Sequence, residues 1–497
     1  MESEEINEVI HMKALVLAAG QGNRLEELTK QKPKALLRIA GIPLLGRVLH
    51  GMREVGVQQV SIIVGYKADV IRKEISEHYA GLDLHYVDAP NWEKGNLYSF
   101  LAAQGIFETH FILCMCDHIF DTQIARKLLE SEFDSALLLA IDRKGYAFDD
   151  TKVLERNGMI IKIGKSINPS NCVDTGLFLC SPEIFKHANK AAHQGAVELA
   201  DAVRVAALNK DARAIDVSGH YWADIDTKQD LKRGKRILVK DTQKKRGASD
   251  FIAHYLNRPI ENAIVYHLSD LKVTPNQLTV ATNVLAWLVT YLFFSGHLLI
   301  GSILTFMVGV MDGLDGKLAR IRKRETRLGR MEHAFDLLFE FSWLIALALF
   351  LSRAEGLLPL ELCMFTLMFT AFYRFCYDQF SRTMKVSLDT YGRFERAFRR
   401  VAGRRNIYNI YMLVGVIFGV PLYSLFGILI HSALTAAVYA YRAAVHMHAS
   451  DRLCALRNRR VPDIIMTQLG LQPQMEICPN NRCKRILLGG HRYKKGL

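Results

Sequence analysis

A glycine-rich loop followed by two cations is the first group of residues suited to chemistry. Gly20 and Gly22 follow an apolar run, Arg24 comes two residues later, and Lys34 follows after ten more. Glycines beyond a strand let the backbone approach a phosphate closely, and the exposed amides there form an anion cradle. The Arg24 guanidinium is a fork that suits phosphate oxygens. The segment is therefore predicted to bind a phosphorylated substrate.

Three aspartates in the same half of the chain predict a divalent metal site. Asp117 ends the apolar run FILCMCD, and a carboxylate at the open end of a parallel sheet is well placed to hold Mg²⁺. Asp224 and Asp226 in YWADIDT are expected to form the second half of this site, although Asp224 could instead belong to a solvated turn. The expected cofactor is Mg²⁺ or Mn²⁺.

A second group of carboxylates lies in the apolar half of the chain. Asp312 and Asp315 are three residues apart, so both project from one face of a helix. Carboxylates inside a membrane are costly and usually functional, paired with cations. Gly316 permits the close approach of a nucleotide, and Arg320 can meet a diphosphate. Two divalent ions held here would neutralise the diphosphate and the nucleotide that leaves.

More acidic residues follow on the next apolar segment. Glu332, Asp336 and Glu340 recur every four residues and share one helical face.

The elements that must position these groups change in character near residue 240. Before it, apolar runs alternate with amphipathic stretches, which predicts an α/β, Rossmann-like domain with a mainly parallel sheet covered by helices on both faces. After it come six apolar runs, each close to the ~20 residues that span a bilayer. Buried helices of a large soluble domain are the alternative. The runs lie near 278–295, 298–311, 337–352, 356–373, 407–421 and 424–445.

These patterns predict five segments and an all-α, six-helix transmembrane domain. The amphipathic stretch that opens the membrane domain is expected to lie on the membrane surface. The segments are an N-terminal extension (1–12), the α/β domain (13–239), a polar linker (240–250), the transmembrane domain (251–450) and a basic tail (451–497).

Charge predicts the location of the chain. Of its 497 residues, Lys and Arg exceed Asp and Glu by 14, and the cations cluster between alternate apolar runs and in the tail. The positive-inside bias places both basic loops, the α/β domain and the tail in the cytoplasm. The acidic first twelve residues lack the apolar core of a secretory signal. We therefore expect a multi-pass cell-membrane protein whose basic charge serves phosphorylated substrates and lipid rather than nucleic acid.

The first half resembles the sugar-phosphate nucleotidyltransferase family, whose signature LxAGxGxRLxxxT…PKxL is present from Leu17 to Leu36. The resemblance implies that a substrate phosphate attacks the α-phosphorus of a nucleoside triphosphate and releases pyrophosphate, with Lys34, Arg24 and the metal neutralising charge. The stretch EKGNLYS, with Gly95 and Asn96, resembles the cytidylyltransferase branch and implies CTP. Three further residues match the region that holds the sugar or polyol phosphate, namely Lys165, Asp174 and Gly176.

The apolar half resembles the CDP-alcohol phosphotransferase family, whose motif is DxxDGxxAR, eight residues, GxxxDxxxD. The first part matches from Asp312 to Arg320 at every fixed position. In the second part the carboxylates Glu332 and Asp336 stand one residue early. The resemblance implies that Glu332 is the third metal ligand and that Asp336 is a ligand or the general base, with His333 as a rival for either role. Either the register is shifted in this branch or the site is damaged.

The pairing of the two domains resembles the bifunctional family that joins inositol-1-phosphate cytidylyltransferase to di-myo-inositol phosphate phosphate synthase. It implies that inositol 1-phosphate is cytidylylated, that the CDP-alcohol then passes its phosphoalcohol group to an inositol phosphate with release of CMP, and that the chain dimerises through its membrane helices. Three alternatives stay open: a lipid or other polyol acceptor, another alcohol such as phosphocholine, and a cytidylyltransferase held by a catalytically silent anchor.

Overall fold

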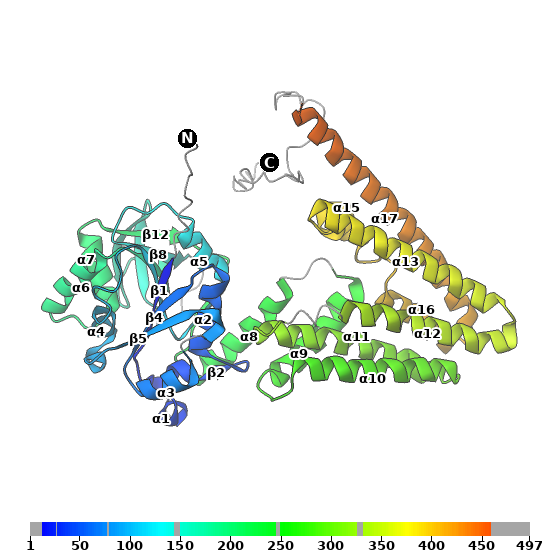
Figure 1. Cartoon of the computed structure of the whole chain (residues 1–497), viewed down its shortest axis with the longest axis horizontal. Coiled ribbons are helices and arrows are strands. Elements are labelled where there is room, and N and C mark those ends of the chain that lie inside the picture. The colour runs from blue at the N-terminus through cyan, green and yellow to red at the C-terminus, as the bar shows by residue number, and fades with distance from the viewer. Residues whose placement is uncertain are drawn as a thin grey trace, which may run out of the picture. The chain divides into compact units, whose positions relative to one another are not determined.

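The computed structural model describes residues 12–25, 27–76, 79–143, 150–244, 249–325 and 332–458. Most of the expected extension 1–12 and tail 451–497 lie outside these residues. The chain forms two compact units, the first built mainly from residues before 241 and the second mainly from those after (Figure 1). The bounds of the domains inside these units stay predictions.

The first unit is organised around a nine-stranded mixed sheet. Its strand order is β5-β4-β1-β6-β11-β8-β12-β10-β9. Neighbours from β5 to β6 pair in parallel, as do β12 and β8, whereas β11 pairs antiparallel with both β6 and β8. The strands are β1 (Lys13–Ala18), β4 (Gln59–Val64), β5 (Asp83–Asp88), β6 (Phe111–Met115), β8 (Leu137–Asp142), β9 (Lys152–Arg156), β10 (Met159–Gly164), β11 (Cys172–Cys180) and β12 (Ala212–Asp216).

The expected mainly parallel sheet is thus a mixed one, and a Rossmann-like fold is not confirmed. The physical reason lies in β11, whose second part, GLFLC, is apolar and fully buried and gives no sequence signal for the direction of the strand. An apolar strand buried on both faces carries no sequence signal for its orientation, which is decided by its neighbours.

Helices cover both faces of this sheet, as predicted. Alternate residues of β1 enter two different cores: Leu15 and Leu17 pack on one side, and Ala14 and Val16 on the other. This follows from the two-residue period of a strand. The helices of the unit are α1 (Glu27–Gln31), α2 (Leu44–Glu54), α3 (Ala68–Glu74), α4 (Asn96–Leu101), α5 (Thr122–Leu129), α6 (Ile184–His193), α7 (Leu199–Leu208) and α8 (Lys228–Lys244).

Two small ladders and the end of α8 complete this unit. β7 (His118–Phe120) pairs with β13 (Trp222–Asp224), and β2 (Arg38–Ile39) pairs with β3 (Ile42–Pro43). Helix α8 continues to Lys244, so the first residues of the expected linker 240–250 are helical. Lysine, glutamine and leucine favour helices, which explains this extension.

The second unit is entirely helical among its described residues. Helix α9 (Arg258–Leu268) follows a short π-helical turn (Ala253–Asn257). Phe251, Tyr255 and Ile260 are exposed while Asn257 and Glu261 are buried, so this stretch is amphipathic as predicted. The remaining helices are α10 (Pro275–Phe294), α11 (Leu298–Ile321), α12 (Glu332–Glu355), α13 (Leu358–Met384), α14 (Leu388–Tyr391), α15 (Arg393–Phe398), α16 (Arg405–Ile417) and α17 (Pro421–Asn458).

Five helices in the described part of the chain, α10 to α13 and α17, are long and apolar enough to cross a membrane. Only 22% to 44% of each apolar segment is buried, so most of its apolar surface faces outward, as a bilayer requires. The predicted six-helix count is not confirmed. The run near 407–421 forms α16, whose 13 residues rise about 20 Å against a hydrocarbon core of about 30 Å. Gly419, with φ +72°, and Pro421 end this helix early.

Candidate active sites

All the residues predicted for the first site line one cleft in the first unit. The glycine loop follows β1, Asp117 lies just beyond the end of β6, and Asp224 ends β13. Because β1 and β6 are parallel neighbours, their carboxyl ends open onto the same edge of the sheet. The predicted residues that line the cleft are Gly20, Gly22, Arg24, Lys34, Gly95, Asn96, Asp117, Lys165, Asp174, Gly176, Asp224 and Asp226.

Lys34 lies among the three aspartates. Its Nζ is 2.5 Å from Asp117 Oδ2 and 3.9 Å from Asp224 Oδ1, and it also donates to Asp226. Burial by itself would lower the pKa of Lys34, but the neighbouring carboxylates outweigh it and hold that pKa well above its ordinary value. Burial would likewise raise the pKa of Asp117, yet the ammonium and His118 hold it well below its usual range. The site therefore keeps the Lys34 cation beside the Asp117 carboxylate.

The β7–β13 ladder completes a candidate metal centre. It pairs His118 with Asp224, and ligand atoms of Asp117, His118 and Asp224 lie within 4.8 Å of one another. Two carboxylate oxygens and one imidazole nitrogen are a donor set that divalent cations accept. Asp226 is not in this set, and its carboxylate pairs with Arg24 at 2.9 Å and with Lys34. A metal role for Asp226 stays a prediction.

His118 is a member of this site that sequence reasoning did not single out. Its Nδ1 lies 2.9 Å from Asp117 Oδ1. Burial would lower the pKa of His118, but Asp224 and Asp117 raise it to about 9, so a metal ion that takes this ring as a ligand has to displace its proton. Its position directly after Asp117 was the available signal. Burial, together with the like charge of Asp117, raises the pKa of Asp224 to about 6. The positive charges of His118 and Lys34 offset this increase only in part.

The predicted substrate-binding residues have more varied surroundings. Asn96 Oδ1 accepts from the backbone N–H of Leu199, 2.7 Å away, at the start of α7. Asp174 Oδ1 accepts from the backbone N–H of Gly176 at 2.7 Å, and burial raises the Asp174 pKa to about 6. Lys165 is exposed at the cleft. Its amine is thus accessible to a soluble phosphate.

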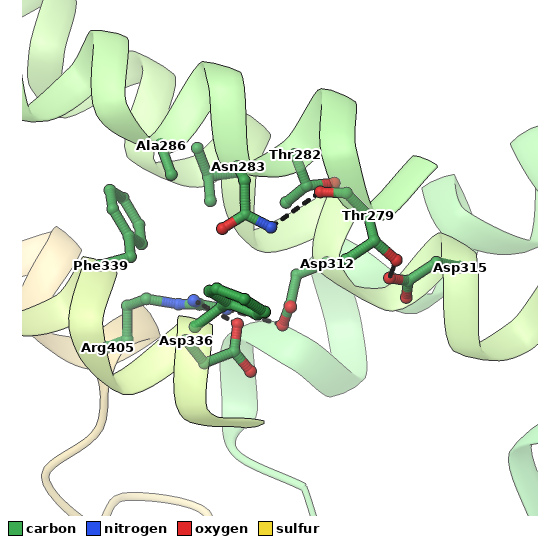
Figure 2. Close-up of a pocket in the computed structure, with 11 residues that line it drawn as sticks. Thr279, Thr282, Asn283, Ala286, Asp312, Asp315, Asp336, Phe339 and Arg405 are labelled. Atoms are coloured by element: carbon green, nitrogen blue, oxygen red, sulfur yellow. Dashed lines mark hydrogen bonds and ion pairs between the residues drawn. The ribbon is translucent and has the colours of Figure 1, made fainter. Parts of the chain in front are cut away.

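The second site is a small pocket between α10, α11, α12 and the start of α16 (Figure 2). Asp312 and Asp315 of α11 and Asp336 of α12 all line it, so the three carboxylates converge as the sequence predicts. Thr279 of α10 donates its hydroxyl to Asp315 Oδ2 at 2.5 Å. The Arg405 guanidinium lies 2.7 Å from Asp312 Oδ2 and 3.3 Å from Asp336 Oδ1.

Other residues predicted for this site lie outside the pocket lining. The Gly316 N–H donates to Asp315 Oδ1 at 2.5 Å, and Arg320 lies further along α11. The side chains of Glu332 and His333 are outside the described residues. Glu340 is 1% exposed and pairs with Arg374 of α13 rather than lining the pocket.

Thr279 and Arg405 were missed by sequence reasoning. Thr279 belongs to the VTPNQLT segment, which forms the start of α10. Arg405 belongs to a run of basic residues, which was used only to orient the chain. The contacts of Arg405 with Asp312 and Asp336 show that this carboxylate pocket can hold a positive charge.

Comparison with family models agrees with this division into two sites. Residues 14–199 match the MobA-like NTP transferase domain, and residues 272–420 match the CDP-alcohol phosphatidyltransferase family. Each match contains residues of one of the two sites described above. Enzymes of both families generally use divalent metals.

Individual relatives join the same two parts. The chain is 35% identical to the bifunctional IPC transferase and DIPP synthase of Aquifex aeolicus over 70% of its length and 79% of that protein. It is 31% identical to the protein of that name from Rubrobacter xylanophilus over 64% of its length and 72% of the relative. A solved structure, the inositol-1-phosphate CTP transferase of T. maritima, is 26% identical with a TM-score of 0.43, over 47% of this chain and 97% of its own.

These matches confirm the resemblance that the sequence motifs predicted, and they confirm that the chain is an enzyme with two activities. The cytidylyltransferase domain comes first and the CDP-alcohol phosphotransferase domain second. The chain belongs to the family of bifunctional IPC transferases and DIPP synthases.

Proposed function

We propose that the first domain transfers CMP from CTP to inositol 1-phosphate and that the second domain passes the phosphoinositol group of the resulting CDP-inositol to an inositol phosphate, releasing CMP. The observation that carries this proposal is the presence of two separate carboxylate sites, each with its own cation, in a chain whose relatives are bifunctional. The CTP choice rests on the EKGNLYS stretch, whose Gly95 and Asn96 line the first cleft.

In the first step an oxygen of the substrate phosphate attacks the α-phosphorus of CTP. A new P–O bond forms, the bond from the α-phosphorus to the bridging oxygen breaks, and pyrophosphate leaves with its charge. The phosphate is already a nucleophile, so the protein mainly positions it and neutralises charge. Arg24 and Lys34 bind the triphosphate oxygens of CTP, and Lys165, which lines the same cleft, binds the phosphate of inositol 1-phosphate. Mg²⁺ held by Asp117 and Asp224 would supply further neutralisation.

In the second step a hydroxyl of the acceptor attacks the phosphorus that carries the alcohol. A P–O bond forms to the acceptor, the bond to the bridging oxygen of CMP breaks, and CMP leaves. Asp312 and Asp315 would hold divalent ions that neutralise the diphosphate. Asp336 serves as a further ligand or takes the proton from the attacking hydroxyl, because it lines the same pocket.

The surroundings of both sites belong to the proposal. The apolar helices cross the membrane, the first domain and the basic loops face the cytoplasm, and two chains pair through their membrane helices. The outward-facing apolar surface of the five long helices supports membrane crossing, and the cations that lie between alternate apolar runs support the orientation. The pairing of two chains rests on the resemblance to the bifunctional family alone.

The proposal is tested on full-length protein in membranes given CTP, Mg²⁺ and a panel of phosphorylated alcohols, with products read by mass spectrometry. Wild type should consume inositol 1-phosphate in preference to phosphocholine and form a product with two inositols. Asp312→Asn should accumulate CDP-inositol and release no CMP, while the control Asp378→Asn, an exposed partner of Arg382, should behave as wild type. Undiminished CMP release by Asp312→Asn would favour a silent anchor.

A further inference from the structure

Arg405 lines the second site and pairs with two of its carboxylates. Its two terminal nitrogens reach different carboxylates, one on Asp312 of α11 and one on Asp336 of α12, at 2.7 Å and 3.3 Å. Figure 2 shows the Arg405 side chain extending toward both of these aspartates, and the side chain is only 13% exposed. The Phe339 ring lies beside it, with its centroid 5.7 Å from Arg405 Cζ.

Electrostatics explains why a cation is present there. Two carboxylates that converge away from water repel each other, and leaving them without a counter-charge is strongly destabilising. A guanidinium presents paired donors in a rigid fork, so one arginine can bind two carboxylates at once. Arg405 therefore joins α11, α12 and α16 at the point where the carboxylates meet.

A divalent ion in this pocket needs the same oxygen lone pairs. Asp312 Oδ2 accepts from Arg405, and a metal ligated by that oxygen would place two like charges within contact distance. Asp315, which lines the same pocket, accepts from the Thr279 hydroxyl and from the Gly316 N–H.

We propose that Arg405 is a built-in counter-ion that bridges Asp312 and Asp336 in the metal-free enzyme and is displaced from them when a divalent cation binds. Arg405 is thus a positioning residue, which holds the carboxylates in place for the metal and competes with it. The inference rests on the proposed function, since it takes these carboxylates as metal ligands. By linkage, loss of the Arg405 contacts must tighten metal binding and weaken the metal-free structure.

The test measures Mn²⁺ binding and thermal unfolding of the full-length protein in detergent after treatment with a chelator. Mn²⁺ bound by the parent but not by Asp312→Asn is assigned to the second site, which separates it from the first domain. Arg405→Gln should bind this Mn²⁺ about tenfold more tightly, a coupling of the usual size between linked sites. The melting temperature of metal-free Arg405→Gln should be lower than that of the metal-free parent. Adding Mn²⁺ should raise the melting temperature of the variant by more than it raises that of the parent.

Two further variants keep the inference open to refutation. Arg405→Lys retains a charge but has a shorter side chain without the guanidinium fork, so it should shift Mn²⁺ affinity in the same direction by a smaller factor, and it serves if Arg405→Gln does not fold. Arg382→Gln, which removes an exposed arginine of the same unit, should leave both readings unchanged. Unchanged or weaker Mn²⁺ binding in both Arg405 variants would overturn the proposal. Since Mn²⁺ binding needs no turnover, tightened binding in an enzyme that releases no CMP would refute the proposed function alone.

Discussion

Lys34 is the side chain on which the first site most depends. It is 8% exposed on its side chain and contacts three carboxylates that otherwise repel one another. Lys34→Met should lower cytidylyl transfer about 100- to 1,000-fold, as loss of one preorganised charge does elsewhere. Pyrophosphate release from CTP measures this. Lys32→Met, at an exposed neighbouring lysine, is the control, and equal activity of the two variants would contradict the assignment.

A substitution at Gly176 would add a single carbon atom next to the His118 ring. The φ of Gly176 is +76°, and a Cβ there would lie 2.4 Å from His118 Nε2, so the ring would be pushed from Asp117. Gly176→Ala should cost about 100-fold in cytidylyl transfer, the effect of a misplacement near 1 Å. Gly105→Ala, with φ +85° but open space around it, has a similar backbone cost. Similar losses in both variants would show that backbone strain alone is responsible.

At the scale of elements, the helices of the first unit hold the sheet through aromatic packing. Phe100 of α4 and Phe185 of α6 stack with centroids 4.6 Å apart, and Phe185 also lies 6.0 Å from Phe111 of β6, the strand that leads to Asp117. Phe185→Ala removes about 3–5 kcal/mol of packing. It should lower the temperature at which full-length protein loses cytidylyl transfer by about 10 °C. Leu208→Ala, at an exposed side chain, should not.

At the scale of the whole molecule, each predicted site is built within its own unit of the chain. The CDP-alcohol must therefore leave the first site before the second can use it. Mixing Lys34→Met protein with Asp312→Asn protein should restore formation of the final product, which neither makes alone. Mass spectrometry of the mixture checks this. A mixture as inactive as its components would indicate direct transfer of the intermediate within one chain.

Features encoded within one helix or loop were easier to predict from the sequence than features that depend on the backbone geometry or on distant parts of the chain. The glycine loop, the Asp312–Asp315 pair and the apolar helices were predictable because each is encoded by spacing within one element. The six-span count is not confirmed at α16, where Gly419 and Pro421 shorten a helix whose composition alone suits a membrane. Apolar composition gives the tendency to cross a bilayer, but backbone geometry sets the length.

The sequence by itself therefore determined which chemistry this protein contains: two phosphate-handling sites, their carboxylates and the membrane setting of the second. Only the tertiary structure decided which charges meet. Arg405 reaches Asp312 from 93 residues away, and the β7–β13 ladder places His118 beside Asp224. Such pairings come from packing between distant elements, which no spacing along the chain records, and the antiparallel direction of β11 was set in the same way.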